Sequence, residues 1–409
     1  MFDLLDELLF PADRYSLLPK YDSSFALQFN DRPGLPLRVV TRGRTQYFNY
    51  REEDLPHALV ETAPLTMRTL TTPLVTRFEE DKPEQAAMQD APRHWSAAIY
   101  TADGELLPEF SELSERFNGK RRDGYNFNIN LPRVDRARAS KARRLKGRHV
   151  YMGYLRAHFG HFLLESLARA WAMLDLEPGT KILFHPSIPK TYPIPVFARE
   201  ILAAMDVDPV RVVLAHEDLV PDELIVPTPQ FWIEWKGSPG MCLAFDRVRE
   251  RLTRLQSATF LPRRVYLTRR LMGAPLRRRA AQFAHNSRRH DHLVGKNLLN
   301  EDEVESLFAA RGFDIIAPET RSLREQIILV ANASEIAGVT GSALHLALFN
   351  GNPESKLIAL DVRSSVNQHI VEQVRGTRAF HMNCVKSRDE LGQPQLDCAL
   401  IWQALKEIL

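Results

Sequence analysis

From residue 149 onward the sequence alternates between two kinds of segment, and this alternation constrains the fold more than any other feature. Short runs rich in Val, Ile, Leu and Tyr, such as "HVYMGYL" and "KILFH", are separated by stretches whose apolar residues have helical spacing. Successive strands joined by helices need crossover connections, so they form parallel sheets of the Rossmann type. The Pro- and aromatic-rich stretch "TPQFWIEWKGSPGM" divides the alternation into two series. We therefore predict an α/β fold with two Rossmann-like domains.

The chain of 409 residues is long enough for two such domains. The predicted N-terminal domain covers residues 1–235, is irregular over 1–93 and has its Rossmann-like core at about 148–228. The second domain covers 236–385. The last segment, 386–409, contains the amphipathic stretch "LDCALIWQALKEIL", which predicts a C-terminal helix that packs back on the first domain.

The composition, with 44% hydrophobic and 26% charged residues, is that of a globular protein. The formal net charge of +3 gives no global argument for nucleic-acid binding. The basic segment 120–148 fits a solvated face or an anion-binding role. The longer basic insertion 273–295 fits a cover over bound phosphates, contact with an anionic acceptor or contact with an acidic membrane surface. Nucleic acid is disfavoured because only Phe283 in this insertion could stack on bases.

Localisation is predicted from the cysteines and from the apolar runs. Cys242, Cys384 and Cys398 are odd in number and lack the spacing of a zinc site, which favours a reducing compartment. The start "MFDLLDELLF" is acidic where a signal peptide is basic, and no apolar run approaches the ~20 residues that span a bilayer. We expect a cytoplasmic protein, and peripheral contact with the inner face of the membrane stays open.

The loop "GVTGSALHLALF" joins a predicted strand to a predicted helix in the second series. Thr340, Gly341, Ser342 and Ala343 follow the strand directly, where free backbone amides attract an anion. Taken alone, the loop fits a phosphate cradle and a tight turn equally well. Ligands bind at the carboxyl ends of parallel strands, and the pair Arg269 and Arg270 also follows a predicted strand. Two such features in one domain favour a diphosphate-bearing ligand.

The segment "AHFGHFLLESLARAW" holds His158, His161 and Glu165. If a helix begins near Phe159, then His161 and Glu165 share one face, and a continuous helix is expected over 159–175. A histidine can accept a proton from a hydroxyl, and a carboxylate can orient the histidine or act as the base itself. Structural roles for these side chains stay open, and zinc is disfavoured because the spacing is not HExxH.

The order of these segments resembles the family 61 glycosyltransferases, whose bacterial members include capsular polysaccharide biosynthesis proteins. The resemblance rests on "GHFLLESLARAWAM", "VYLTRR" and the stretch from "LLNEDEVESLF" to "GVTGSALHLALF", and it covers about residues 94–362. It implies a GT-B architecture in which two Rossmann-like domains face each other across a cleft. It also implies inverting, metal-independent transfer without a cofactor, from a nucleotide sugar held mainly by the second domain.

The resemblance also implies roles for single residues. The family's motifs fall on Gly160, His161 and Glu165, on Thr268, Arg269 and Arg270, on Asn300 and Glu301, on Gln326, and on Gly338, Thr340, Gly341, Ser342, Ala343 and Leu344.

Three departures from the family pattern concern the donor site. Thr340 stands where the family usually has a histidine, so that contact is lost or is supplied by His345. Lys296 replaces an arginine and keeps the charge without the planar fork. The basic insertion is longer than expected.

The predicted protein is an inverting hexosyl- or pentosyltransferase of surface polysaccharide biosynthesis that transfers a sugar from a nucleotide-activated donor to a glycan or lipid-linked acceptor. His161 or Glu165 is the predicted base, and His158 lies on the acceptor side. The alternative is a catalytically degenerate transferase that binds its ligand as a scaffold in a polysaccharide assembly complex.

Overall fold

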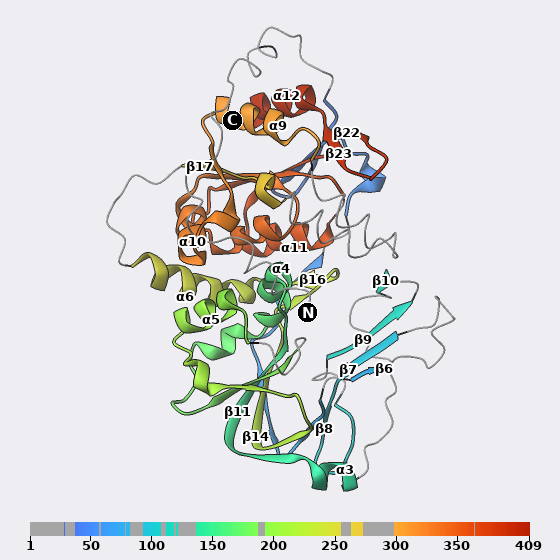
Figure 1. Ribbon diagram of the computed structural model, residues 1–409, viewed down its shortest axis with the longest axis vertical. Helices are drawn as coiled ribbons and strands as arrows, with labels where there is room; N and C mark the ends of the chain where they lie inside the picture. The colour runs from blue at the N-terminus through green and yellow to red at the C-terminus, as the bar shows by residue number, and fades with distance from the viewer. Residues whose placement is uncertain are drawn as a thin grey trace. The chain divides into compact units, whose positions relative to one another are not determined.

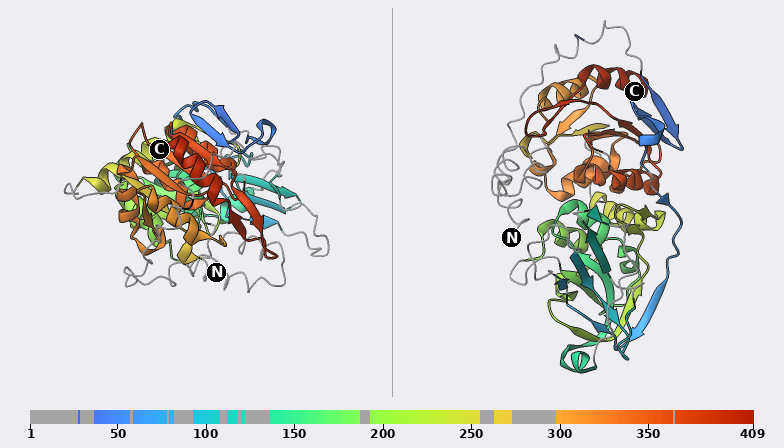
Figure 2. Two further views of the ribbon diagram at one scale, coloured as in Figure 1. Left: turned by 90° about the horizontal axis from the view of Figure 1, so that it is seen from above. Right: turned by 90° about the vertical axis from the view of Figure 1, so that its right-hand side faces the viewer.

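The computed structural model divides into two compact units (Figures 1 and 2). The first unit is Ala58–Arg251, and the second is Phe2–His57 together with Leu252–Leu409. The division differs from the expected boundaries, because the segment before Ala58 joins the second unit and the first unit extends to Arg251. The residues that the structure describes are 28, 37–56, 59–77, 79–81, 93–107, 112–117, 120–121, 136–186, 193–254, 263–272, 298–363 and 365–409.

The first unit is built on a mixed sheet with a parallel centre. Its strand order is β13-β12-β11-β14-β5-β8, and β4 also pairs with β14. The pairs among β11 to β14 are parallel, whereas β4, β5 and β8 pair antiparallel. The bounds are β4 Met67–Thr71, β5 Leu74–Val75, β8 Ile99–Tyr100, β11 Arg143–Leu155, β12 Lys181–Pro186, β13 Val212–Leu214 and β14 Leu219–Pro227.

The first unit contains two smaller sheets and several helices besides this sheet. A second, antiparallel sheet has the order β10-β9-β7-β6, and a small sheet has the order β15-β16-β3. The helices α5 and α6 belong to the same unit. The bounds are β3 Leu59–Val60, β6 Glu79–Asp81, β7 Arg93–Ala97, β9 Glu112–Phe117, β10 Lys120–Arg121, β15 Phe231–Trp232, β16 Lys236–Gly237, α3 Arg136–Lys141, α5 Val196–Ala204 and α6 Cys242–Thr253.

The strand order of the first unit fixes where a ligand would bind. From β11 the chain moves outward through β12 to β13 and then returns to place β14 on the other side of β11. The carboxyl ends of β11 and β14 therefore flank the point at which the direction of strand addition reverses. Open parallel sheets bind their ligands at such a reversal point.

The second unit contains a seven-stranded sheet with the order β1-β2-β21-β20-β19-β17-β18. All pairs from β2 to β18 are parallel, and β1 pairs antiparallel with β2. Its reversal point lies between β17 and β19. The bounds are β1 Val39–Arg42, β2 Thr45–Phe48, β17 Arg264–Leu267, β18 Asp314–Ile316, β19 Glu335–Val339, β20 Lys356–Leu360 and β21 Arg378–Met382.

Helices cover both faces of this sheet. In Figures 1 and 2, α9 (Glu301–Ala310) and α12 (Cys398–Ile408) lie on one face, and α10 (Leu323–Asn332) and α11 (Val366–Arg375) lie on the other. Trp402 of α12 packs in one apolar cluster with Phe308 of α9 and Phe380 of β21. The expectation that the C-terminal helix packs on the first domain is therefore wrong. Its amphipathic pattern predicts a buried face but not the surface that covers it.

The helix expected over 159–175 is broken into short turns. The structure has α4 (Phe159–His161), a π turn η3 (Phe162–Ser166) and a 3₁₀ turn η4 (Ala170–Met173). The loop after β19 likewise continues as a 3₁₀ helix, η9 (Ser342–Phe349), rather than as an α-helix. Among the described residues, the structure has no helix with the length and apolar character needed to cross a membrane.

Candidate active site

His161 and Glu165 lie together at the reversal point of the first unit, directly after β11. The Nδ1 atom of His161 is 2.5 Å from Oε2 of Glu165. The imidazole is 46% exposed, whereas the carboxylate is only 2% exposed. A carboxylate can only accept a hydrogen bond, so Nδ1 carries the hydrogen and the neutral ring has its lone pair on Nε2. This arrangement suits a base that takes a proton at Nε2 while the carboxylate fixes the ring.

The π turn places the Glu165 carboxylate against the His161 ring, and Arg156, which follows β11, contacts this turn. The Arg156 guanidinium donates to Oε1 of Glu165 at 3.0 Å, and the backbone N–H of Arg156 donates to Oγ of Ser166 at 2.9 Å. The N–H of Leu167 bonds to the carbonyl of Phe162, which is the five-residue spacing of a π turn. The Arg156 charge stabilises the buried carboxylate, so Glu165 is paired on both of its oxygens.

His158 occupies the N-cap position of α4, but its side chain makes no capping hydrogen bond. Its ring lies edge-on to the His161 ring, with 5.2 Å between the centroids. The structure thus brings His158, His161 and Glu165 together in the first unit. Their predicted roles in acceptor binding and catalysis stay predictions.

In the second unit, Arg269 and Gly341 meet at the reversal point between β17 and β19. Nη2 of Arg269 donates to the carbonyls of Val339 and Thr340, at 3.1 and 2.7 Å. Gly341 has φ 151° and ψ −164°, and a side chain there would collide with the Arg269 guanidinium. The arginine therefore holds the backbone of the predicted donor loop, and only glycine permits this approach.

Arg270 turns instead toward α9, where its guanidinium pairs with the buried Glu305. The hydroxyl of Thr268 is within hydrogen-bonding distance of the carboxylates of Glu305 and Glu301, at 2.5 and 2.9 Å. Burial raises the pKa of the Glu301 carboxyl above its ordinary value. These contacts show that the segment Thr268–Arg270 is fixed by α9, so part of the Arg270 charge is balanced within the fold.

The other predicted donor residues have varied surroundings. Asn300 is at the N-cap position of α9 without a capping hydrogen bond, because its amide instead exchanges two hydrogen bonds with the backbone of Leu396. Gln326 donates to the carbonyl of Arg321. Ser342 and Ala343 open η9 and are half-buried, and His345 is buried further along that helix. Lys296 and the basic insertion 273–295 lie outside the described residues.

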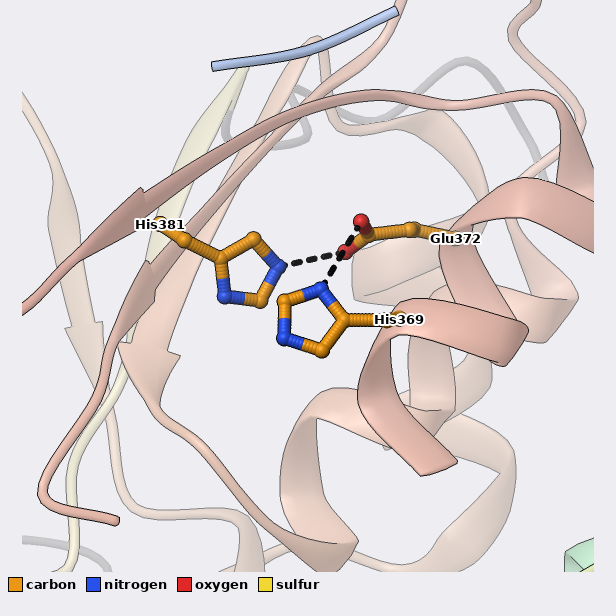
Figure 3. A group of neighbouring side chains, drawn as sticks. All are labelled: His369, Glu372 and His381. Atoms are coloured by element: carbon orange, nitrogen blue, oxygen red, sulfur yellow. Dashed lines mark hydrogen bonds and ion pairs between the residues drawn. The ribbon is translucent and has the colours of Figure 1, made fainter. Parts of the chain in front are cut away.

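Thr340 is buried, and its hydroxyl is hydrogen-bonded to the carboxylate of Asp361 at the end of β20. Asp361 also bonds the Nδ1 atom of His381 at 2.7 Å, and Nε2 of His381 bonds Glu372 at 2.7 Å. His369 lies on the same helix as Glu372, and Figure 3 shows both imidazoles directed at the Glu372 carboxylate. We call Asp361, His369, Glu372 and His381 the buried cluster.

Residues far apart in sequence complete the buried cluster. Tyr50 donates to Asp361 at 2.6 Å, and Thr45 donates to Glu372 at 3.1 Å. Burial alone would lower the pKa of His381, but the charges of Asp361 and Glu372 raise it to about 10. Spacing along the sequence does not predict this cluster, because its residues come from the position after β20, from α11 and from β21, and no local motif joins them.

His369, Glu372 and His381 are also residue types that bind metal ions, and their ligand atoms lie within 4.8 Å of one another. In this arrangement the Glu372 carboxylate itself occupies the point at which both imidazoles are directed (Figure 3). A metal ion there would require the carboxylate to withdraw. The geometry therefore fits a hydrogen-bonded ion network better than a metal centre.

Glu319, which no motif in the sequence singles out, lies in the 3₁₀ turn η8 (Pro318–Thr320) that follows β18. Burial, reinforced by the charge of Glu301, raises its pKa to about 7. Among the described residues, no group hydrogen-bonds to its buried Oε1 atom. Its place after a strand is the only signal in the sequence that could have identified it.

The family model of glycosyltransferase 61 matches residues 159–358. The matched region begins at α4 and runs through β20, so it contains His161, Glu165, Arg269 and the Gly341 loop. No curated protein matches the chain. The match supports assignment to glycosyltransferase family 61 and, with it, a glycosyltransferase activity.

Proposed function

We propose that the protein is an inverting glycosyltransferase that moves a sugar from a nucleotide-activated donor to a glycan or lipid-linked acceptor. The observation that carries the proposal is that a His–Glu pair and a glycine loop each lie at the reversal point of a parallel sheet, within the region that matches the family model. The reaction requires the two units to approach each other as in the GT-B arrangement. A hexosyl or pentosyl donor, a role in capsule synthesis and a cytoplasmic site at the membrane face belong to the same proposal.

In the proposed step, the acceptor hydroxyl attacks the anomeric carbon from the side opposite the leaving nucleotide. The O–H proton passes to Nε2 of His161, the new C–O bond forms, and the bond between the anomeric carbon and the phosphate oxygen breaks with inversion. Glu165 acts as the positioning residue, since its carboxylate is buried and paired with Arg156. This burial favours His161 over Glu165 as the base.

The departing nucleotide diphosphate gains negative charge that the second unit would stabilise. The backbone amides that open η9 at Ser342 and Ala343 are suited to phosphate oxygens. Arg269 fixes the backbone of this loop, and the part of the Arg270 charge that Glu305 does not balance adds to the positive charge after β17. In this scheme protein groups stabilise the charge of the leaving diphosphate in place of a metal ion, and the reaction uses no cofactor.

The test is product formation from a panel of nucleotide sugars with and without divalent metal, followed by mass spectrometry. The variant His161→Ala is expected to lose about two to four powers of ten in transfer rate while it still binds the donor. His149→Gln serves as the matched control, because His149 lies in β11 opposite Lys181, the first residue of β12, and is therefore away from the carboxyl end of the sheet where His161 lies. Full activity of His161→Ala would remove His161 from the role of base.

The same panel separates the enzyme from a scaffold. The observation that favours the scaffold is that the Thr340 hydroxyl is bonded to Asp361, at the position where the resemblance implies a histidine. A scaffold would be stabilised against heat by a nucleotide sugar without transfer or hydrolysis.

A further inference from the structure

The hairpin formed by β15 and β16 follows β14 and lies at the same reversal point as the His161–Glu165 pair. Strand β15 packs against η3, the turn that contains Glu165 and follows α4. The N–H of Gln230 donates to the carbonyl of Ala168 at 2.8 Å, and the Trp171 indole donates to the carbonyl of Thr228 at 2.9 Å. The hairpin is therefore fixed to the segment that positions the proposed base.

The turn of this hairpin exposes an aromatic side chain at a cost in backbone strain. Trp232 pairs with Lys236 across the hairpin, and between them Glu234 has φ 61°, which a residue with a side chain rarely adopts. The turn leaves Trp235 36% exposed. Strained backbone of this kind persists where the surrounding structure holds it, and it occurs preferentially at binding sites.

A charged pair adjoins the exposed indole. The Lys236 ammonium lies 4.6 Å from the Trp232 ring centroid and 4.5 Å from that of Trp235. It also forms an ion pair with Glu61. The parallel pairing of β16 with β3 places the two partners side by side. The ammonium lies over one face of the Trp235 ring, so the hairpin presents the remaining exposed part of this ring beside an ion pair in which Glu61 is 44% exposed and Lys236 17% exposed.

We propose that this hairpin, Trp232–Lys236, is an acceptor subsite that binds a neutral saccharide ring. A pyranose has an apolar C–H face that matches an indole face, and its hydroxyls need polar partners at the ring edge. Trp235 provides the face, and Glu61 and Lys236 provide the partners. This proposal rests on the proposed function, because it assigns the acceptor to the side of the sheet that holds His161.

Binding is tested with the full chain on a printed array of defined oligosaccharides, and the dissociation constant of each bound glycan is then measured in solution. The variant Trp235→Ala is expected to bind its glycans about ten-fold or more weakly, which corresponds to ~1.4 kcal/mol or more. Trp235→Phe keeps an aromatic face and should retain most of the affinity. The matched control is Trp402→Phe, a buried tryptophan of α12 in the second unit, which should leave glycan binding unchanged.

Kinetics separate this subsite from the proposed activity. Trp235→Ala should raise KM for the acceptor while leaving kcat, the donor KM and the hydrolysis of donor by water unchanged. If the wild-type protein transfers no sugar from any nucleotide donor, the proposed function is refuted, and the glycan array still tests saccharide binding by the hairpin. The subsite is refuted if no arrayed glycan binds the wild-type chain, if Trp235→Ala binds glycans as tightly as wild type does, or if Trp235 is needed only for binding to phospholipid vesicles.

Discussion

Gly341 gives the sharpest test of the donor loop, because its substitution should break a specific contact. Its backbone conformation, φ 151° and ψ −164°, belongs almost only to glycine, and forcing alanine into it costs about 1 to 3 kcal/mol. The added Cβ would also displace the Arg269 guanidinium from the carbonyls of Val339 and Thr340. Losing charge-assisted hydrogen bonds of this kind costs about 1.5 to 3 kcal/mol. Gly341→Ala should therefore destabilise the second unit by roughly 2.5 to 6 kcal/mol, the sum of the two costs.

A matched glycine separates the two contributions to this loss. Gly376 ends α11 with φ 71°, and a Cβ built there meets no atom within 4 Å. Gly376→Ala should therefore cost only the left-handed strain, about 1 to 2 kcal/mol. A double-mutant cycle adds a second control. When Arg269 is already replaced by alanine, Gly341→Ala should cost only the backbone strain, because there is no guanidinium left for the new Cβ to displace.

The assay is urea unfolding, monitored by the hydrogen exchange of peptides from β19 and η9. Because these peptides belong to the second unit, the measurement reports on that unit even if the two units unfold separately. Additive effects of Gly341→Ala and Arg269→Ala would refute the proposed contact. So would a destabilisation by Gly341→Ala that is no larger than that of Gly376→Ala.

Two further predictions concern the second unit. The pKa of His381 is raised from 6.5 to about 10, so its protonated ring contributes stability that is fully present below pH 6.5 and is lost as the pH rises toward 10. Its ring should therefore stay protonated at pH 8 in nitrogen NMR spectra, with the signal assigned by its loss in His381→Gln. A deprotonated ring, or a stoichiometric metal ion in the purified protein, would contradict the ion network. Ser322 and Glu325 form a capping box at the start of α10. Ser322→Ala should therefore lower the free energy of unfolding, measured by urea titration, by about 1 kcal/mol. Arg324→Ala on the same turn is the control and should change this free energy by less than half as much.

Periodicity predicted strands β11, β12, β17 and β19, because strand and helix patterns are local properties of the sequence. It failed over 159–175, where the apolar spacing favours one continuous helix. The π turn there coincides with contacts that Glu165 and Ser166 make with Arg156, at the end of the preceding strand. Such a contact arises only once β11 and the turn are packed together.

The candidate site was predictable only in part for the same reason. The glycine loop and the Arg269 segment could be found because each directly follows a strand. The hydrogen bond from Thr340 to Asp361, and the pairing of Asp361 with His381, depend on which strands become neighbours in the sheet. Strand order is a tertiary property, so spacing along the sequence carries no trace of it.

The position of β2 in the second sheet has a consequence for how the chain is made. Thr45 and its partner Glu372 are 327 residues apart, so at about 5 to 20 residues per second a ribosome needs roughly 20 to 60 seconds to supply the partner. The first unit, Ala58–Arg251, is one continuous segment inserted between the two parts of the second unit, so it can fold before Glu372 is synthesised. A fragment that starts at residue 252 would leave the edge of β21 bare and prone to aggregation. Fusing residues 37–57 to its C-terminus by a flexible linker should restore that edge.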